Sequence, residues 1–166
     1  MKVSLSAMIE APIDEVFAYF DDPANTLEFT SHAKSFDVVS VAPDDRRTFD
    51  VHMRSGGLTW TQTVEQVVRE RPTRLLTRGG TWTTDRGRLG LVVTTDRRFS
   101  ADGYGTRLDV TVEYLLDQPR RRAFSALLNW LQRGETRLEL EHQLRLMAGL
   151  IEGRHDAQAA GDIRER

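Results

Sequence analysis

Three polar side chains occupy positions of the sequence where apolar residues are expected. Gln62, Thr95 and Arg97 stand in stretches whose alternation puts each on the same face as apolar neighbours. A polar group buried on such a face needs a partner, either within the protein or on a ligand. For Arg97, an edge position or a bulge is the alternative explanation. These residues predict a polar contact inside an otherwise apolar interior.

The chemistry that such side chains support is the orientation of a reactive apolar substrate. Tyr114, Gln62 and Arg97 are the candidate catalytic residues, because each can hold a polar group of a substrate in place. The sequence contains no Gly-x-Ser-x-Gly elbow, so a hydrolase triad has no support. The pairs Asp14-Glu15 and Asp21-Asp22 are interpreted as helix-end charges rather than as an acid/base pair.

The histidines do not indicate a metal site. The chain has four of them, at His32, His52, His142 and His155, and no two are separated by one helical turn. Only His32, in a predicted loop, is a candidate for the mouth of a cavity. Cysteine is absent, which excludes disulfides and Cys-based zinc sites. We expect neither a metal nor a cofactor.

Composition limits the classes of partner. The 166 residues suffice for one domain with a proper core. Basic and acidic side chains number 23 and 25, so no net field favours nucleic acid or an acidic membrane. No apolar run approaches the roughly 20 residues that span a bilayer. We therefore expect a cytoplasmic protein with no nucleic acid partner and no integral membrane segment.

The elements that must position the candidate residues are mainly strands. Period-two alternation predicts strands at residues 2–10, 35–41, 47–54, 58–69, 74–81, 89–101 and 107–115. Two short helices are predicted after the first strand, at 13–20 and 24–29. Short turns between consecutive strands favour an antiparallel meander. The predicted fold class is α+β: a curved antiparallel sheet of about seven strands gripping a long C-terminal helix.

The C-terminal helical run is divided by Gly134. After it, Leu140, Leu144, Met147 and Ile151 recur at helical spacing as one apolar stripe. A single helix over residues 119–153 would be about 52 Å long, which exceeds the diameter of a small domain. We therefore predict that 135–153 is the gripping helix and that 119–133 is a kinked or separate segment.

The role of residues 119–133 stays open at this stage. They are expected to form either a lid over the cavity or the contact surface of a homodimer. The predicted domain is 1–153, followed by a polar tail at 154–166 that is expected to fray.

Several short motifs resemble a known superfamily. They are the run 9–17 (Ile-Glu-Ala-Pro-Ile-Asp-Glu-Val-Phe), then Asp22-Pro23, then Gly105-Thr106-Arg107-Leu108 before the last strand. In order and spacing, over residues 2–153, they resemble the SRPBCC or START-like (helix-grip) superfamily, and within it the polyketide cyclase/dehydrase-type proteins. The resemblance implies a seven-stranded sheet and a pocket for a lipid, a polyketide or another apolar molecule. It does not imply a reaction.

The pocket should be lined by inward strand residues and the sheet-facing stripe of the helix. The alternative for each apolar candidate is that it is simply core. The predicted ligand-binding residues are Phe49, Val51, Met53, Trp60, Gln62, Leu91, Val93, Phe99, Val110, Val112, Tyr114, Leu140, Leu144 and Met147.

Three functions remain open at this stage. The favoured one is binding or carriage of a hydrophobic small molecule, because no correctly spaced acid/base pair is apparent. The second is a cyclase- or dehydratase-like enzyme acting on a polyketide-type substrate in the same cavity. The third is a partner-binding domain with a vestigial cavity, suggested by the basic and then apolar run at 120–128.

Overall fold

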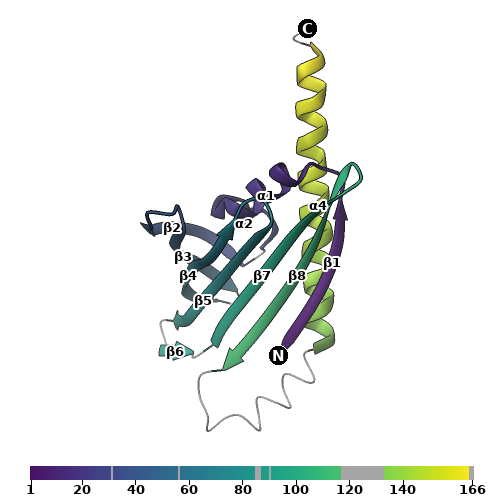
Figure 1. Cartoon of the computed structure of the whole chain (residues 1–166). Helices are drawn as coiled ribbons and strands as arrows, with labels where there is room; N and C mark the ends of the chain where they lie inside the picture. The colour runs from purple at the N-terminus through teal and green to yellow at the C-terminus, as the bar shows by residue number, and fades with distance from the viewer. Residues whose placement is uncertain (31, 56, 85–86, 90, 117–132, 165–166) are drawn as a thin grey trace.

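The computed structural model describes residues 1–164 except 31, 56, 85–86, 90 and 117–132 (Figure 1). Its strands are β1 (Lys2–Ile9), β2 (Ala33–Val41), β3 (Arg47–Ser55), β4 (Leu58–Glu70), β5 (Arg74–Thr84), β6 (Gly87–Leu89), β7 (Leu91–Asp102) and β8 (Gly105–Leu116). Its helices are α1 (Ile13–Asp21), the 3₁₀ turn η1 (Pro23–Asn25), α2 (Thr26–Phe29) and α4 (Arg133–Arg164). The predicted α+β class, with short helices after the first strand, is confirmed.

The strands form one open, curved antiparallel sheet in the order β1-β8-β7-β5-β4-β3-β2. The first strand lies at one edge, where it pairs with the last, and β2 forms the other edge (Figure 1). The predicted strand at 89–101 differs in one respect: Gly87–Leu89 is a separate short strand that pairs only with β5, and β7 begins at Leu91.

The C-terminal helix is longer than predicted. It begins at Arg133, so that Gly134 lies in its first turn, and it continues through Gly153 to Arg164. The predicted helix end at Gly153 was therefore wrong. The residues that follow make contacts: His155 Nδ1 lies 2.8 Å from Glu15 Oε2, and Arg154 donates to Asn25.

Other expectations about the C-terminal part remain predictions. The kink, and the segment 119–132, lie outside the described residues. The boundary of the domain at residue 153 also stays a prediction, although α4 visibly extends beyond the sheet (Figure 1).

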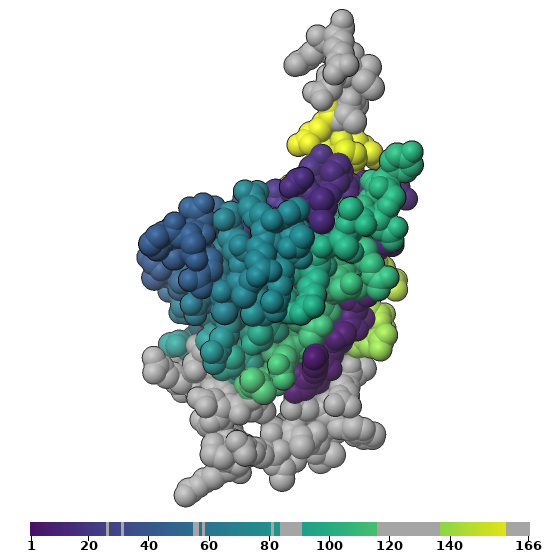
Figure 2. Space-filling model, in the orientation of Figure 1, coloured from purple at the N-terminus to yellow at the C-terminus, as the bar shows by residue number. Residues whose placement is uncertain are grey.

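The main core lies where α1 and α4 cover the sheet. Val16 and Phe17 of α1 are fully buried, and the Phe17 ring meets Phe99 of β7 edge to face, 5.4 Å between centroids. The α4 stripe predicted from spacing is buried at Leu144, Met147 and Ile151, and α4 packs chiefly along β1. In the space-filling view the strands form a continuous outer face, with α4 beside β1 at its edge (Figure 2).

Two of the motifs noted in the sequence meet in space where β8 begins. Ile9, at the end of β1, pairs with Thr106, whose buried hydroxyl donates to the Ala11 carbonyl at 2.8 Å. A Cβ added to Gly105 would lie 2.7 Å from the Ile9 carbonyl oxygen, which is closer than Cβ atoms approach backbone. Only glycine therefore fits where β8 passes the end of β1.

Replacing glycine with alanine should have opposite effects at a crowded glycine and at an uncrowded one. Gly105→Ala should destabilise the protein by about 1–3 kcal/mol, because backbone must move to make room. Gly149→Ala, on α4 with no atom within 4 Å of the added Cβ, should stabilise by about 0.8–1 kcal/mol through helix propensity. Urea unfolding of both variants measures the two effects, and a Gly105→Ala variant as stable as the unchanged protein would contradict the packing described.

Candidate ligand cavity

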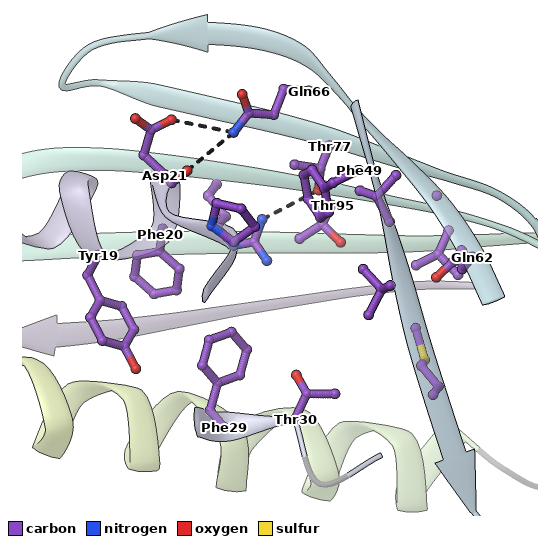
Figure 3. A pocket seen from close by; sticks show the side chains of 17 residues that line it. Tyr19, Phe20, Asp21, Phe29, Thr30, Phe49, Gln62, Gln66, Thr77 and Thr95 are labelled. Atoms are coloured by element: carbon purple, nitrogen blue, oxygen red, sulfur yellow. Dashed lines mark hydrogen bonds between the residues drawn. The ribbon is translucent and has the colours of Figure 1, made fainter. Parts of the chain in front are cut away.

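Two adjoining cavities lie between the sheet and the helices. The sheet chamber, about 170 Å³, lies under β3, β4, β5 and β7 and is closed by α1 and α2 (Figure 3). The helix chamber, about 200 Å³, lies between β1, β7, β8 and α4. The chambers share five lining residues: Phe29, Thr30, Val93, Thr95 and Arg97. They therefore adjoin along a common wall, to which α2, the loop after it and β7 contribute residues.

Arg97 lies at this shared wall without a carboxylate partner. Its guanidinium stacks over the Phe20 ring, 5.4 Å from the centroid, and its Nη1 donates a long hydrogen bond of 3.5 Å to Thr77 Oγ1. Among the described residues, no carboxylate lies within ion-pair distance of it. Burial lowers the pKa of Arg97 to about 10, which still leaves the side chain protonated at neutral pH.

Gln62 takes its place in the sheet chamber because a neighbouring strand carries glycine. Its amide lies over Gly79 of β5, where an added Cβ would come within 2.3 Å of Gln62 Nε2. The same Nε2 donates to the Gly80 carbonyl at 3.3 Å. A register shift in the β4–β5 pairing between Gln62 and Val64 allows this approach. The amide nitrogen is thus held by the backbone of β5.

A buried ion pair closes the opposite end of the sheet chamber. Asp21 receives two hydrogen bonds from Arg69, of 2.8 and 2.7 Å, and the two side chains are only 8% and 10% exposed. Gln66 Nε2 also donates to Asp21 at 3.4 Å (Figure 3). Burial opposes ionisation, but Arg69 outweighs it and holds the pKa of Asp21 below its ordinary value. Asp21 is therefore a charge that the protein already balances.

Tyr114 places a phenol in the helix chamber. It lines that chamber together with Val110, Val112 and Leu140. Burial raises the pKa of Tyr114, so the hydroxyl stays protonated and acts as a hydrogen-bond donor rather than a base.

Most of the predicted site residues do line this space. Of the apolar set, Phe49, Val51 and Met53 line the sheet chamber, and Val93 lines both chambers. The helix chamber contains Val110, Val112, Tyr114, Leu140, Leu144 and Met147. The polar residues picked from the sequence also lie there: Gln62 in the sheet chamber, and Thr95 and Arg97 in both.

Three predicted residues lie elsewhere. Phe99 packs under α1 against Phe17, in the core. Trp60 stacks on Trp82 with ring centroids 5.4 Å apart, beyond the Gln62 end of the sheet chamber. Leu91 lines neither chamber. The alternation put all three on the inward face, but it could not show where along each strand the chambers end.

Sequence reasoning missed the residues of the two short helices that line the space opposite the sheet. Tyr19, Phe20 and Asp21 come from α1, and Phe29 and Thr30 from α2 and the loop after it. Phe20 lies on the apolar face of the helix predicted at 13–20, which was a usable signal. Nothing in the sequence showed that α1 ends over the chamber.

The histidines are placed away from the chambers. His52 lies 2.9 Å from Asp37, on the outer face, and His142 is exposed on α4. His32 is exposed beside Trp60, with centroids 6.4 Å apart, and lines neither chamber. Within the described residues, no group of three His, Asp or Glu side chains could hold a metal ion.

A curved sheet that grips a long C-terminal helix, with an apolar space between them, defines a START-like, helix-grip domain. Residues 1–147 match the family described as polyketide cyclase/dehydrase and lipid transport. The chain belongs to this family.

Solved structures share the fold at low identity. TTHA0849 from Thermus thermophilus is 20% identical, with a TM-score of 0.67 over 93% of this chain and 99% of the other. A START superfamily protein from Mycobacterium smegmatis is 12% identical, with a TM-score of 0.65 over 95% and 98%.

The di-domain ARO/CYC protein BexL, from the BE-7585A biosynthetic pathway, is 18% identical, with a TM-score of 0.67. That match covers 93% of this chain and half of BexL. Comparison with curated proteins finds no match. Among the described residues no helix is long and apolar enough to cross a membrane.

The buried ion pair predicts a large loss of stability when one partner is removed. Asp21→Asn should lower the free energy of unfolding by about 3–5 kcal/mol, because it leaves the largely buried Arg69 charge with only the distant, exposed Asp45 carboxylate, 3.9 Å away. The matched control is Glu141→Gln, which breaks the surface pair with Arg137 on α4 and should cost only about 0.3–0.5 kcal/mol. Chemical denaturation measures both, and equal effects would show that the buried pair does not stabilise the fold.

The same pair predicts a specific response to acid. Since the folded-state pKa of Asp21 lies below its unfolded value, the unfolded chain takes up a proton first as the pH falls. The stabilisation is therefore fully present above about pH 4 and is lost as the pH falls through the folded-state pKa. Unfolding free energy measured against pH should fall more steeply below about pH 4 for the unchanged protein than for Asp21→Asn. Parallel curves would contradict the assignment.

Proposed function

We propose that this protein binds a hydrophobic small molecule in the two chambers between the sheet and α4. The observation that carries the proposal is the shared wall: two partly open, mostly apolar cavities of about 170 and 200 Å³ adjoin at Phe29, Val93 and Arg97. An apolar cavity of about 150 Å³ already holds a benzene molecule. Two such chambers in contact suit a ligand with two ring systems, or a ring and a chain.

The family description supports a lipid or a polyketide-like compound as the ligand. Carriage in the cytoplasm fits this role, with the bound molecule shielded from water. Contact with a second copy through the segment 119–133 stays a prediction.

A cyclase-like reaction on a polyketide-type substrate is the second candidate function. It is favoured by one observation: Tyr114 and Arg97 line the same helix chamber, so a neutral phenol and a cation can both reach one ligand. Such donors can stabilise a carbonyl oxygen as negative charge develops on it. The resemblance of the fold to BexL, an ARO/CYC protein, is consistent with this candidate.

Filling the shared wall should abolish binding. Val93→Phe adds a ring at a residue that lines both chambers, so it should displace an apolar dye such as N-phenyl-1-naphthylamine. We expect the fluorescence enhancement of this dye to fall at least about tenfold, since little room remains for either of its ring systems.

The control adds the same ring at a site away from the cavity. Val39→Phe lies on the edge strand β2, where the side chain is 57% exposed, and should leave dye binding unchanged. Circular dichroism of both variants shows that the fold is retained. Full binding by a folded Val93→Phe protein would show that the dye binds elsewhere and would remove the basis of the proposal.

A further inference from the structure

We infer that the bound molecule carries one acidic oxygen group, ionised at neutral pH, that pairs with Arg97 at the wall shared by the two chambers. The inference rests on the proposed function and goes further, because it assigns the chemical class of the ligand: an anion on an apolar skeleton.

The first argument is the contrast between Arg97 and two other half-buried arginines of the sheet, Arg69 and Arg74. Arg69 binds the Asp21 carboxylate through two hydrogen bonds, and Arg74 lies 3.0 Å from Asp96 on the outer face of the sheet. Arg97 has only an aromatic face and one long hydrogen bond to Thr77, among the residues described. A desolvated cation without an anion is costly, and proteins rarely keep one unless something pairs with it.

The nearest candidate for an internal partner is already occupied. Asp21 lines the same sheet chamber, but its oxygens accept from Arg69 and Gln66. Because Asp21 is balanced in this way, it neither neutralises Arg97 nor strongly repels a ligand anion. The positive charge at the shared wall is therefore left for whatever enters the chambers.

Hydroxyl donors flank the cation on the same face of the sheet. Thr95 lines both chambers, and Thr77, its register partner on β5, lines the sheet chamber beside it. A guanidinium presents a planar fork of N–H donors that matches two oxygens at once. The cation and the two hydroxyls together can satisfy a carboxylate or an ionised enol.

The number of charges decides between a monoanion and a more highly charged group. Within the described lining, Arg97 is the only basic residue of either chamber, and the rest of the wall is mainly apolar. A phosphate would bring more negative charge than one cation balances in a desolvated site. A carboxylate, or the oxygen of an acidic enol, matches the site in charge.

The experiment compares two pairs of probes that differ in charge. One pair is 2-naphthoate and its neutral analogue 2-naphthamide. The other is 4-hydroxycoumarin, an acidic enol that is ionised at neutral pH, and the neutral 4-methoxycoumarin. Isothermal titration calorimetry at neutral pH gives the affinity of each probe for the full chain. We expect each anion to bind more tightly than its neutral partner. The pair with the larger ratio of anion affinity to neutral affinity identifies the acidic group as a carboxylate or an enolate.

Three variants test whether the Arg97 side chain causes the preference for anionic probes. Arg97→Met removes the charge at similar length and should weaken anion binding by about ten- to a hundredfold, leaving the neutral probes unchanged or tighter. Arg97→Lys keeps a positive charge but not the planar fork of N–H donors. Its affinity for the anionic probes should lie between those of the unchanged protein and Arg97→Met. Arg98→Met is the matched control on the same strand: that arginine is exposed and pairs with Asp96, so no affinity should change.

Thermal unfolding of the ligand-free variants separates binding from structure. Arg97→Met should be at least as stable as the unchanged protein, because it removes a half-buried charge that has no carboxylate partner among the described residues. Marked destabilisation, or equal loss of charged and neutral probes, would make Arg97 a structural residue and overturn the inference. Equal binding of charged and neutral probes by the unchanged protein overturns the inference alone. Failure of all four probes to bind overturns the proposed function together with it.

Discussion

The close approach of β8 to the end of β1 is the constraint on which the architecture depends. At Gly105 the chain passes within contact distance of the Ile9 carbonyl, and the Thr106 hydroxyl binds the Ala11 carbonyl just beyond. These contacts fix the point where β1 leaves the sheet and turns into α1. Since α1 then lies over Phe99 of β7, its last residues reach the sheet chamber. Contacts at this corner of the sheet thus help to hold α1 where its last residues line the sheet chamber.

Much of the fold was predictable because it depends on local periodicity. Alternation along β3, β7 and β8 identified the inward residues, and the spacing of Leu144, Met147 and Ile151 identified the buried face of α4. The same periodicity singled out Gln62, Thr95 and Arg97 as polar residues facing inward, and all three line the space. The long extent of α4 was not predictable, because contacts of its polar residues with α1 and η1, not its own apolar pattern, support the helix beyond Gly153.

The buried ion pair was missed where the regular alternation is interrupted. The β4–β5 register shifts between Gln66 and Val68, so Arg69 is not an outward residue as strict alternation suggests but reaches Asp21. Its partner lies 48 residues away in the sequence, and no local pattern links the two. For the same reason the sequence alone presents Asp21 as an ordinary helix-end charge. A bulge is a property of two strands together, and a single sequence read one strand at a time does not reveal it.

Arg69 and Arg97 show why the site needs the whole structure to be recognised. Both are arginines of inner strands. Alternation in the sequence puts Arg97 on the inward face and Arg69 on the outward face, but it does not show which of them has a carboxylate partner. The difference lies in the opposing element: the end of α1 brings a carboxylate to Arg69 and an aromatic ring to Arg97. One charge is balanced by the chain, and the other faces a cavity. Because a half-buried cation without an anion lowers stability, in the inference drawn above the balancing group for Arg97 comes from the ligand. The same α1 terminus that closes the chamber therefore separates the arginine that holds the fold together from the one that is available to a ligand.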